Sequence, residues 1–231
     1  MKKLIAGLVL AGGLSATAQA HELTVEITNL TNGIYYTPLL VSAHNRKTDL
    51  FEAGEPASAS LQAMAEGGDI SGLVADLESA GAHIVANPAE GLLGPGETAT
   101  AYLETNKRNR YLSIVAMLLP TNDGFMGLDA QRIPKHRGSY TYYINGYDAG
   151  TEANNEIING GGAPGVPGIP ADPGGNSGSG ATGVTDSEQN SVVHIHRGVL
   201  GDMDLNGGVS DLNAAVHHWL NPVAKVVVTV R

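Results

Sequence analysis

The sequence predicts an all-β fold of the antiparallel sandwich type. Short apolar or alternating stretches recur along the chain, and turns rich in Gly, Pro or Asn separate them. Only one region has helical periodicity. Strands and helices do not alternate in the rhythm of βαβ units, so a parallel sheet is not expected. The chain is long enough for one large β-domain with its own core.

The first twenty residues are expected to be a signal peptide and not part of the fold. Lys2 and Lys3 precede an apolar run over residues 4–14, and a small-x-small motif ends at Ala20. The apolar run is too short to anchor the chain across a membrane. We therefore expect cleavage after Ala20, a single domain over residues 21–231, no transmembrane segment, and a secreted, periplasmic or cell-surface location.

The first predicted elements are strands and one helical region. Residues 22–28 alternate apolar and polar side chains, as a half-buried strand does. Further strands are predicted at 35–43, 82–86 and 97–104. Residues 56–80 have apolar side chains three and four apart, and the Gly67-Gly68 pair divides them into two short helices.

The second half of the chain is predicted to begin with two strands that each lead into an acidic loop. One strand covers residues 110–119 and the other 139–144, with a turn at 134–138 between them. Residues 159–190 are rich in Gly, Pro and Ser, so we expect a flexible excursion within the domain. The last strands are predicted at 191–196 and 224–230.

The charge of the chain excludes some classes of partner. Its 23 acidic residues face 13 basic ones, for a formal net charge of −10, and loss of Lys2 and Lys3 makes it more acidic still. Such a protein should repel nucleic acid and bare anionic lipid unless a divalent cation bridges them. The chain has no cysteine, so disulfides cannot restrain the fold, and a bound metal is one alternative restraint.

The two acidic loops are predicted to meet at one end of the sheet. The first contains Asp123 and Asp129, and the second contains Asp148 and Glu152. Clustered carboxylates repel each other unless a cation compensates them, and calcium prefers such oxygen ligands. The alternative is turn chemistry, in which Asp side chains accept hydrogen bonds from nearby backbone amides. Asp129 also fits the start of a strand.

Five segments carry a resemblance to a known family. They are T-P-L-L-V-S-A-H-N at 37–45, F-E-A-G-E-P-A-S…A-E-G-G at 51–68, P-T-N-D-G-F-M-G at 120–127, Y-D-A-G-T-E at 147–152, and V-H-I-H…W-L-N-P-V-A-K-V at 193–226. In these segments the chain resembles the spondin amino-terminal domain family, the module found in F-spondin and mindin.

The resemblance implies an eight-stranded antiparallel β-sandwich similar to the calcium-dependent phospholipid-binding sandwiches. It also implies one Ca²⁺ ion held between loops, with acidic ligands at Asp123, Asp148 and Glu152. Animal members act in the extracellular matrix and in cell adhesion. This chain differs from them at Gly124, where they have an aromatic residue, and in its long Gly/Pro-rich excursion.

A second possible calcium motif lies at residues 201–213. Asp202, Asp204, Asn206 and Ser210 match positions of an EF-hand loop, but Asn213 stands where a bidentate Glu is required. The strand predicted before this segment also leaves no room for an entering helix. The alternative is an acidic turn followed by a short helix capped by Ser210 or Asp211.

Histidines supply a third candidate site. His194 and His196 are two apart on a predicted strand, so they face the same side, as in some copper and zinc sites. His44, His217 and His218 are possible further ligands, and cleavage would make His21 an amino-terminal copper chelator. The alternative is a pair of hydrogen-bonded, half-buried histidines.

The residues favour a binding module over an enzyme. The chain has no G-x-S-x-G nucleophile motif, and its glycine tract lacks the Lys of a phosphate-binding loop. We therefore expect a secreted, non-catalytic, calcium-binding module for adhesion or for surface or matrix interaction, whose partner is an extracellular protein, a glycan or a lipid. The alternatives are a calcium-dependent lipid- or glycan-binding module and a histidine-based copper or zinc enzyme.

Overall fold

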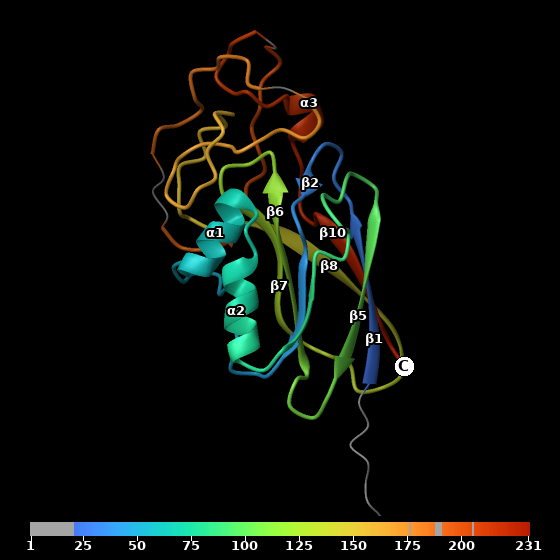
Figure 1. Ribbon diagram of the computed structural model, residues 1–231. Coiled ribbons are helices and arrows are strands. Elements are labelled where there is room, and N and C mark those ends of the chain that lie inside the picture. The colour runs from blue at the N-terminus through green and yellow to red at the C-terminus, as the bar shows by residue number, and fades with distance from the viewer. Residues whose placement is uncertain (1–20, 176, 188–190, 205) are drawn as a thin grey trace, which may run out of the picture.

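The computed structural model describes residues 21–231 except 176, 188–190 and 205 (Figure 1). The predicted signal peptide and the side chain of His21 lie outside the described residues. Within the described part, none of the helices combines the length and hydrophobicity that crossing a membrane requires.

Antiparallel strands make up most of the fold, as predicted. They are His21–Asn29 (β1), Tyr35–Tyr36 (β2), Leu40–His44 (β3), His83–Ala86 (β4), Thr98–Thr105 (β5), Tyr111–Leu119 (β6), Gly124–Arg132 (β7), Gly138–Asp148 (β8), His194–Ile195 (β9) and Ala224–Val230 (β10). Eight of them form one path in the order β4-β3-β6-β7-β8-β10-β1-β5, while β2 pairs with β6 and β9 with β8.

The eight strands form one curled, nearly closed sheet in place of the two separate sheets of a sandwich. Strand β8 is the reason, because its first part pairs with β10 and its last part, Asn145–Asp148, pairs with β7. A strand that switches partners in this way joins two layers at a corner. The two ends of the path, β4 and β5, then lie against each other and give a barrel-like body (Figure 1).

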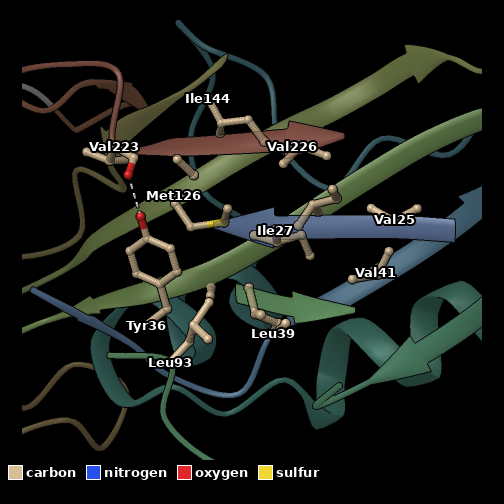
Figure 2. Packing of buried hydrophobic residues seen from close by; sticks show 14 of the residues in the cluster. Val25, Ile27, Tyr36, Leu39, Val41, Leu93, Met126, Ile144, Val223 and Val226 are labelled. Carbon is tan, nitrogen blue, oxygen red and sulfur yellow. Dashed lines mark hydrogen bonds between the residues drawn. The ribbon is translucent and has the colours of Figure 1, made fainter. Parts of the chain in front are cut away.

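Strand β6 lies between two hydrophobic cores and contributes one face to each. Its alternate residues Ile114, Ala116 and Leu118 face the inside of the curled sheet, where they join Val25 and Ile27 of β1. Figure 2 shows this inner core, in which the Tyr36 hydroxyl donates a 2.6 Å hydrogen bond to the Val223 carbonyl oxygen. The intervening residues Val115, Met117 and Leu119 face a second core. A strand buried on both faces needs the continuous apolar run that this sequence has.

Two helices cover the second core. Ala59–Gly67 (α1) and Ser71–Ser79 (α2) confirm the prediction of two short helices divided at a Gly pair. Ser58 caps α1 by accepting a hydrogen bond from Leu61 N at 3.1 Å. Gly68 ends α1 with a φ of 73°, a conformation that glycine adopts without strain.

Several predicted elements differ from the structure, among them the first acidic loop, most of which is strand β7. The strand expected at 35–43 is divided into β2 and β3, because Pro38 lacks the backbone N–H that a continuous strand needs. The strand expected at 191–196 is reduced to β9. A short helix does follow the 201–213 segment, Ala214–His217 (α3), but Asn213 caps it. The predicted caps are engaged elsewhere, since Ser210 donates to Glu156 and Asp211 accepts from Ile158 N.

The Gly/Pro-rich segment 159–190 has little regular structure, but its described residues contact the body at buried carboxylates. Glu66 accepts a hydrogen bond from Gly165 N at 2.6 Å, and Glu152 accepts one from Gly168 N at 2.7 Å. Directly after these contacts, Ile169 is completely buried and forms an isolated β-bridge with Ile158. The segment therefore lies against the rim of the sheet, and its flexibility stays a prediction.

Candidate functional site

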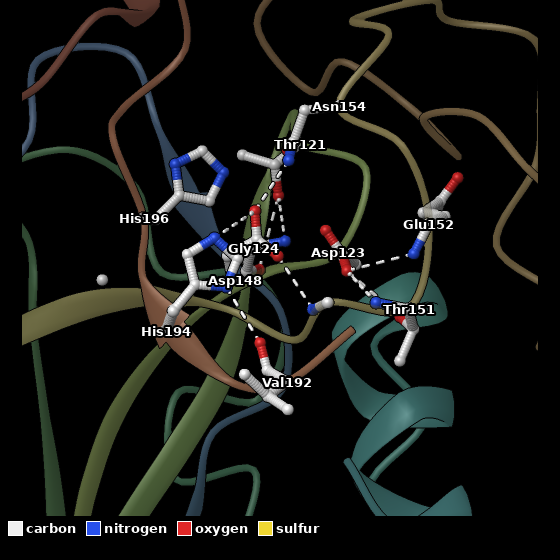
Figure 3. Close-up of polar contacts among 12 residues, drawn as sticks. Thr121, Asp123, Gly124, Asp148, Thr151, Glu152, Asn154, Val192, His194 and His196 are labelled. Carbon is white, nitrogen blue, oxygen red and sulfur yellow. Dashed lines mark hydrogen bonds and ion pairs between the residues drawn. The ribbon is translucent and has the colours of Figure 1, made fainter. Parts of the chain in front are cut away.

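The turn between β6 and β7 brings the two acidic loops together. Strand β7 begins at Gly124, and Gly124 pairs with Asp148 at the end of β8. Asp123 precedes that pair by one residue, and its carbonyl oxygen accepts a hydrogen bond from Ala149 N at 3.2 Å. Glu152 lies in the loop that leaves β8, shortly after Asp148. Figure 3 shows the three carboxylates at one rim of the sheet.

Asp123 is completely buried and has one carboxylate oxygen without a partner. Its Oδ2 accepts hydrogen bonds from Thr151 N at 2.8 Å, from Thr151 Oγ1 at 3.1 Å and from Glu152 N at 3.4 Å. No donor among the described residues reaches Oδ1. Burial, and then the negative charge of Asp148, raise the pKa of Asp123 to about 8, although the backbone amides oppose the shift.

Glu152 repeats this arrangement on the facing loop. Its Oε2 accepts hydrogen bonds from Gly168 N at 2.7 Å and from Asn122 Nδ2 at 3.4 Å. Its Oε1 is buried and, within the described part of the chain, has no hydrogen-bond partner. Burial and then the charges of Glu66 and Asp148 raise the pKa of Glu152 to about 7. The rim thus contains two buried carboxylate oxygens that accept no hydrogen bond.

Asp148 differs from the other two because both of its oxygens contact protein donors. Its Oδ1 accepts a hydrogen bond from Gly150 N at 2.8 Å, and its Oδ2 accepts one from Asn154 Nδ2 at 2.7 Å. His194 Nε2 lies 3.8 Å from the same Oδ2. The carboxylate is therefore held in place by neutral donors and by an imidazole.

The rim fits a hard cation in its charge and in its open oxygens. A buried carboxylate oxygen without a partner is destabilising, and a proton or a cation removes that penalty. As they stand, the described side chains do not group three Asp, Glu, His or Cys residues closely enough to hold a metal ion. Binding would therefore use Asp123 and Glu152 directly, with main-chain oxygens or water filling further positions, since calcium takes six to eight oxygens.

Asp129 and His44 do not belong to this rim. Asp129 lies within β7 and accepts hydrogen bonds from Leu50 N at 2.7 Å and from Ser113 Oγ at 3.0 Å. His44 is buried at the end of β3 and also contacts Ser113, at 2.7 Å through Nε2. Both residues therefore connect β3, β6 and β7 at the other end of these strands.

The histidines near the rim have separate partners. His194 Nδ1 donates to the Val192 carbonyl oxygen at 2.9 Å. His196 is buried, and its Nδ1 accepts from Gly198 N at 2.9 Å, so the proton of the neutral ring resides on Nε2. Burial, and then Arg197 and His194, lower the pKa of His196 to about 3. His217 and His218 bond to the backbone at Asn213 N and Val199 O.

The 201–213 loop uses its acidic side chains to accept hydrogen bonds from its own backbone. Asp202 accepts from Asp204 N at 2.8 Å, from Val209 N at 2.8 Å and from Ser210 N at 3.0 Å. Asp204 in turn accepts from Asn206 N at 3.0 Å. These contacts are those of an acidic turn, the alternative to an EF-hand loop.

Sequence reasoning missed two buried carboxylates around the rim. Glu66 is completely buried on α1, where Gln62 donates to it at 2.8 Å, and this spacing of four residues was a detectable signal. Glu156 accepts hydrogen bonds from Leu200 N at 2.6 Å and from Gly201 N at 2.8 Å. Nothing in the sequence around Glu156 indicates this role, because its partners are more than forty residues away.

Comparison with known proteins identifies a family over the part of the chain that contains the two acidic loops. The family description Spondin_N matches residues 27–157, which contain all three rim carboxylates and end before the Gly/Pro-rich segment. Human Spondin-2 is 28% identical over 126 residues, which are 51% of this chain. The match covers 38% of Spondin-2, so the chain spans well under two thirds of that relative. On the extent of the family match, the chain belongs to the spondin amino-terminal domain family.

Proposed function

We propose that the protein is an exported, non-catalytic, calcium-binding module that acts in adhesion or in surface or matrix interaction. The observation that carries this proposal is the pair of buried, unpartnered oxygens, Asp123 Oδ1 and Glu152 Oε1, beside Asp148. Membership of an adhesion-type module family supports it. The predicted signal peptide supports export.

The electrostatics of the rim favour a divalent ion. Without a cation, burial of three neighbouring carboxylates keeps protons on Asp123 and Glu152 near neutral pH, as their raised pKa values indicate. An ion with two positive charges would replace those protons and compensate the repulsion from Asp148. The open oxygens of Asp123 and Glu152 would bind it directly.

Such an ion would connect three parts of the chain. Asp123 belongs to the β6–β7 turn, and Glu152 belongs to the loop that leaves β8. Through its other oxygen Glu152 also contacts Gly168 of the Gly/Pro-rich segment. We infer that calcium fixes the rim as one surface, which presents a partner-binding face.

A calcium-dependent glycan- or lipid-binding role is the second candidate, and a cavity favours it. A cavity of about 480 Å³ lies beside Glu152, between residues 151–157 and parts of the Gly/Pro-rich segment. Thr151, Asn155 and Thr182 give it polar walls. A calcium ion at Glu152 would lie next to any anionic ligand in this cavity. Calcium-dependent binding to vesicles or polysaccharide would distinguish this role from protein adhesion.

The test is calcium titration by calorimetry with two matched variants. Asp148→Asn removes one negative charge from the rim and should weaken calcium binding by about tenfold or more. Asp204→Asn makes the same change at an exposed position of the 201–213 loop and should leave the affinity unchanged. Equal affinity in wild type and Asp148→Asn would contradict the proposal. A loss confined to Asp204→Asn would place the ion in the 201–213 loop.

A further inference from the structure

The end of the sheet opposite the carboxylate rim collects most of the basic residues. Strand pairing brings the end of β3 to the start of β6, at His44 and Tyr111, and the start of β6 to the end of β7, at Arg132. We call a set of eight exposed cations at this end the basic pole. They are Arg46, Lys47, Lys107, Arg108, Arg110, Arg132, Lys135 and Arg137, eight of the eleven Lys and Arg residues in 21–231.

The cations of the basic pole form no close ion pairs with described residues, although the exposed carboxylates of Glu22, Asp49 and Glu104 lie at the same end. In the part of the chain that the structure describes, the ion pairs within 4.0 Å involve His194 and His217, and neither is at this end. The chain as a whole has a net charge of −10, so positive charge is strongly segregated. Segregated, unpaired cations create a local positive potential that attracts anions.

The basic pole also contains a groove with fixed walls. Three cations, Lys107, Arg110 and Lys135, line a groove of about 320 Å³ together with Ile133 and Pro134. The two segments that form the groove are joined by a 2.9 Å hydrogen bond from Ile133 N to the Arg110 carbonyl oxygen.

Internal hydrogen bonds connect residues of the 105–110 loop to one another and to the turn at Gly81. Asn106 Oδ1 accepts hydrogen bonds from Arg108 N at 2.8 Å and from Asn109 N at 2.9 Å. Asn109 is buried and donates to the Gly81 carbonyl oxygen at 2.7 Å. A charged groove with an ordered frame loses less entropy on binding than a set of mobile surface side chains does.

We propose that the basic pole binds a polyanionic glycan, a sugar chain that carries carboxylate or sulfate groups. The cations would pair with those groups, and the exposed Asn106 side chain in the groove wall would hydrogen-bond to sugar hydroxyls. This inference goes beyond the proposed function, because it involves neither the rim nor calcium.

Two other anionic partners fit the groove less well. Nucleic acid binding to single strands relies on aromatic stacking, and no aromatic side chain lines this groove. A duplex would also meet the acidic remainder of the surface. A second copy of this chain would offer single exposed carboxylates on a folded surface, such as those of Glu52 and Glu55, whereas a glycan can repeat its charges along one chain that follows the groove.

The test is binding of heparin oligosaccharide and of polygalacturonate to the full protein, measured by calorimetry at about 50 mM and about 200 mM NaCl. We expect binding of at least one of these probes, weaker at the higher salt and unchanged by a calcium chelator. The triple variant Lys107→Ala/Arg110→Ala/Lys135→Ala should bind about tenfold more weakly or worse, because three charge contacts are lost. The control Lys225→Ala removes a cation on β10, outside the pole, and should bind like wild type.

Several outcomes would overturn the proposal. The protein could bind neither probe, or the triple variant could bind as tightly as the wild type. Lys225→Ala could lose as much affinity as the triple variant, or a short DNA duplex could bind as tightly as the glycan. Self-association that the triple variant abolishes would assign the pole to a second copy. Thermal melts check that the triple variant is folded. If the triple variant is unfolded, the three single substitutions, each at an exposed side chain, are tested in its place. Failure of calcium binding at the rim would leave this result unaffected.

Discussion

Replacing Asp123 by Asn separates the charge of the rim from its hydrogen bonds. The Asn oxygen can still accept from Thr151 N and Thr151 Oγ1, as Asp123 Oδ2 does at 2.8 and 3.1 Å. What the variant loses is the ionisable group, whose pKa is raised from 3.8 to about 8 by burial and by Asp148. Its new NH2 group takes the position of Oδ1, where no donor in the described part of the chain would repel its hydrogens.

The raised pKa fixes the sign of a pH effect in calcium-free protein. Above about pH 4 the unfolded chain releases this proton while the folded chain retains it up to about pH 8. The stability that the proton provides is therefore complete below pH 4 and is lost as the pH rises towards 8. Each pH unit in that window changes the free energy of unfolding by about 1.4 kcal/mol. Between about pH 5 and about pH 7 the wild type should lose about 3 kcal/mol relative to Asp123→Asn.

The measurement is the difference between the unfolding free energies of the two proteins, from urea titrations with chelator present. Groups that do not interact with Asp123, such as His196, titrate in both proteins, and the difference removes their contribution. Glu152 and Asp148 interact with Asp123, so their response to its charge stays in the difference. Asp186→Asn, the same exchange at an exposed position, should follow the wild-type curve. Calcium at about one hundred times its dissociation constant should then stabilise the wild type by about 2.7 kcal/mol at pH 8, and the variant much less.

Two results would refute this reasoning at different points. A difference curve that is flat from pH 5 to 7 would mean that the Asp123 carboxylate already has a counter-charge or solvent in calcium-free protein. A sloping difference curve with equal stabilisation by calcium in both proteins would confirm the buried charge but exclude Asp123 as a ligand.

Two further predictions concern the packing around the rim. Burial lowers the pKa of His196 to about 3, so its contribution to stability is complete above about pH 6.5 and is lost as the pH falls towards 3. In urea titrations between pH 4 and 7, His196→Gln should abolish this loss, which is about 1.4 kcal/mol per pH unit. An unchanged dependence of the unfolding free energy on pH would contradict the burial of a neutral ring. Gly124→Ala would place a Cβ 2.7 Å from Thr121 Oγ1 and 3.1 Å from His196 Cδ2. It should therefore destabilise the protein by about 1–3 kcal/mol, as measured in thermal melts. The control Gly174→Ala should have little effect, because the atom nearest to its new Cβ lies at 3.5 Å.

Much of the fold follows from local patterns in the sequence. The alternation at Leu23, Val25 and Ile27 predicts the buried face of β1, and the Gly67-Gly68 pair predicts the break between the two helices. Local patterns do not contain the partner switch of β8, because the strand reads the same whether its neighbour is β7 or β10. The single curled sheet is therefore a tertiary property that alternation cannot reveal.

The sequence predicts that the two acidic loops meet at the rim, but it does not predict the burial that shifts the pKa values of their carboxylates. Turn signals and strand order place Asp123 and Asp148 at one end of the sheet, because a hairpin returns the chain to the same rim. The environment of Glu152 depends on Gly168 and Asn122, which lie at sequence distances from it that no spacing rule connects. The histidines show the converse, since a spacing of two residues predicts a shared face but not that His196 packs beside Trp219, at 5.0 Å between ring centres.

The two ends of the sheet use charge in opposite ways. At the rim, burial and the neighbouring Asp148 disfavour the charged forms of Asp123 and Glu152, and a proton or a cation relieves that penalty. At the basic pole the cations are exposed to solvent, so their repulsion is weak and screened, and what they gain from a partner depends on salt. Either ligand should stabilise the folded protein by mass action, but the stabilisation by a polyanion at the basic pole should decrease with added salt much more than the stabilisation by an ion at the rim. Because the two surfaces lie at opposite ends of β6 and β7, one molecule can engage both at once, as a module that links two surfaces must.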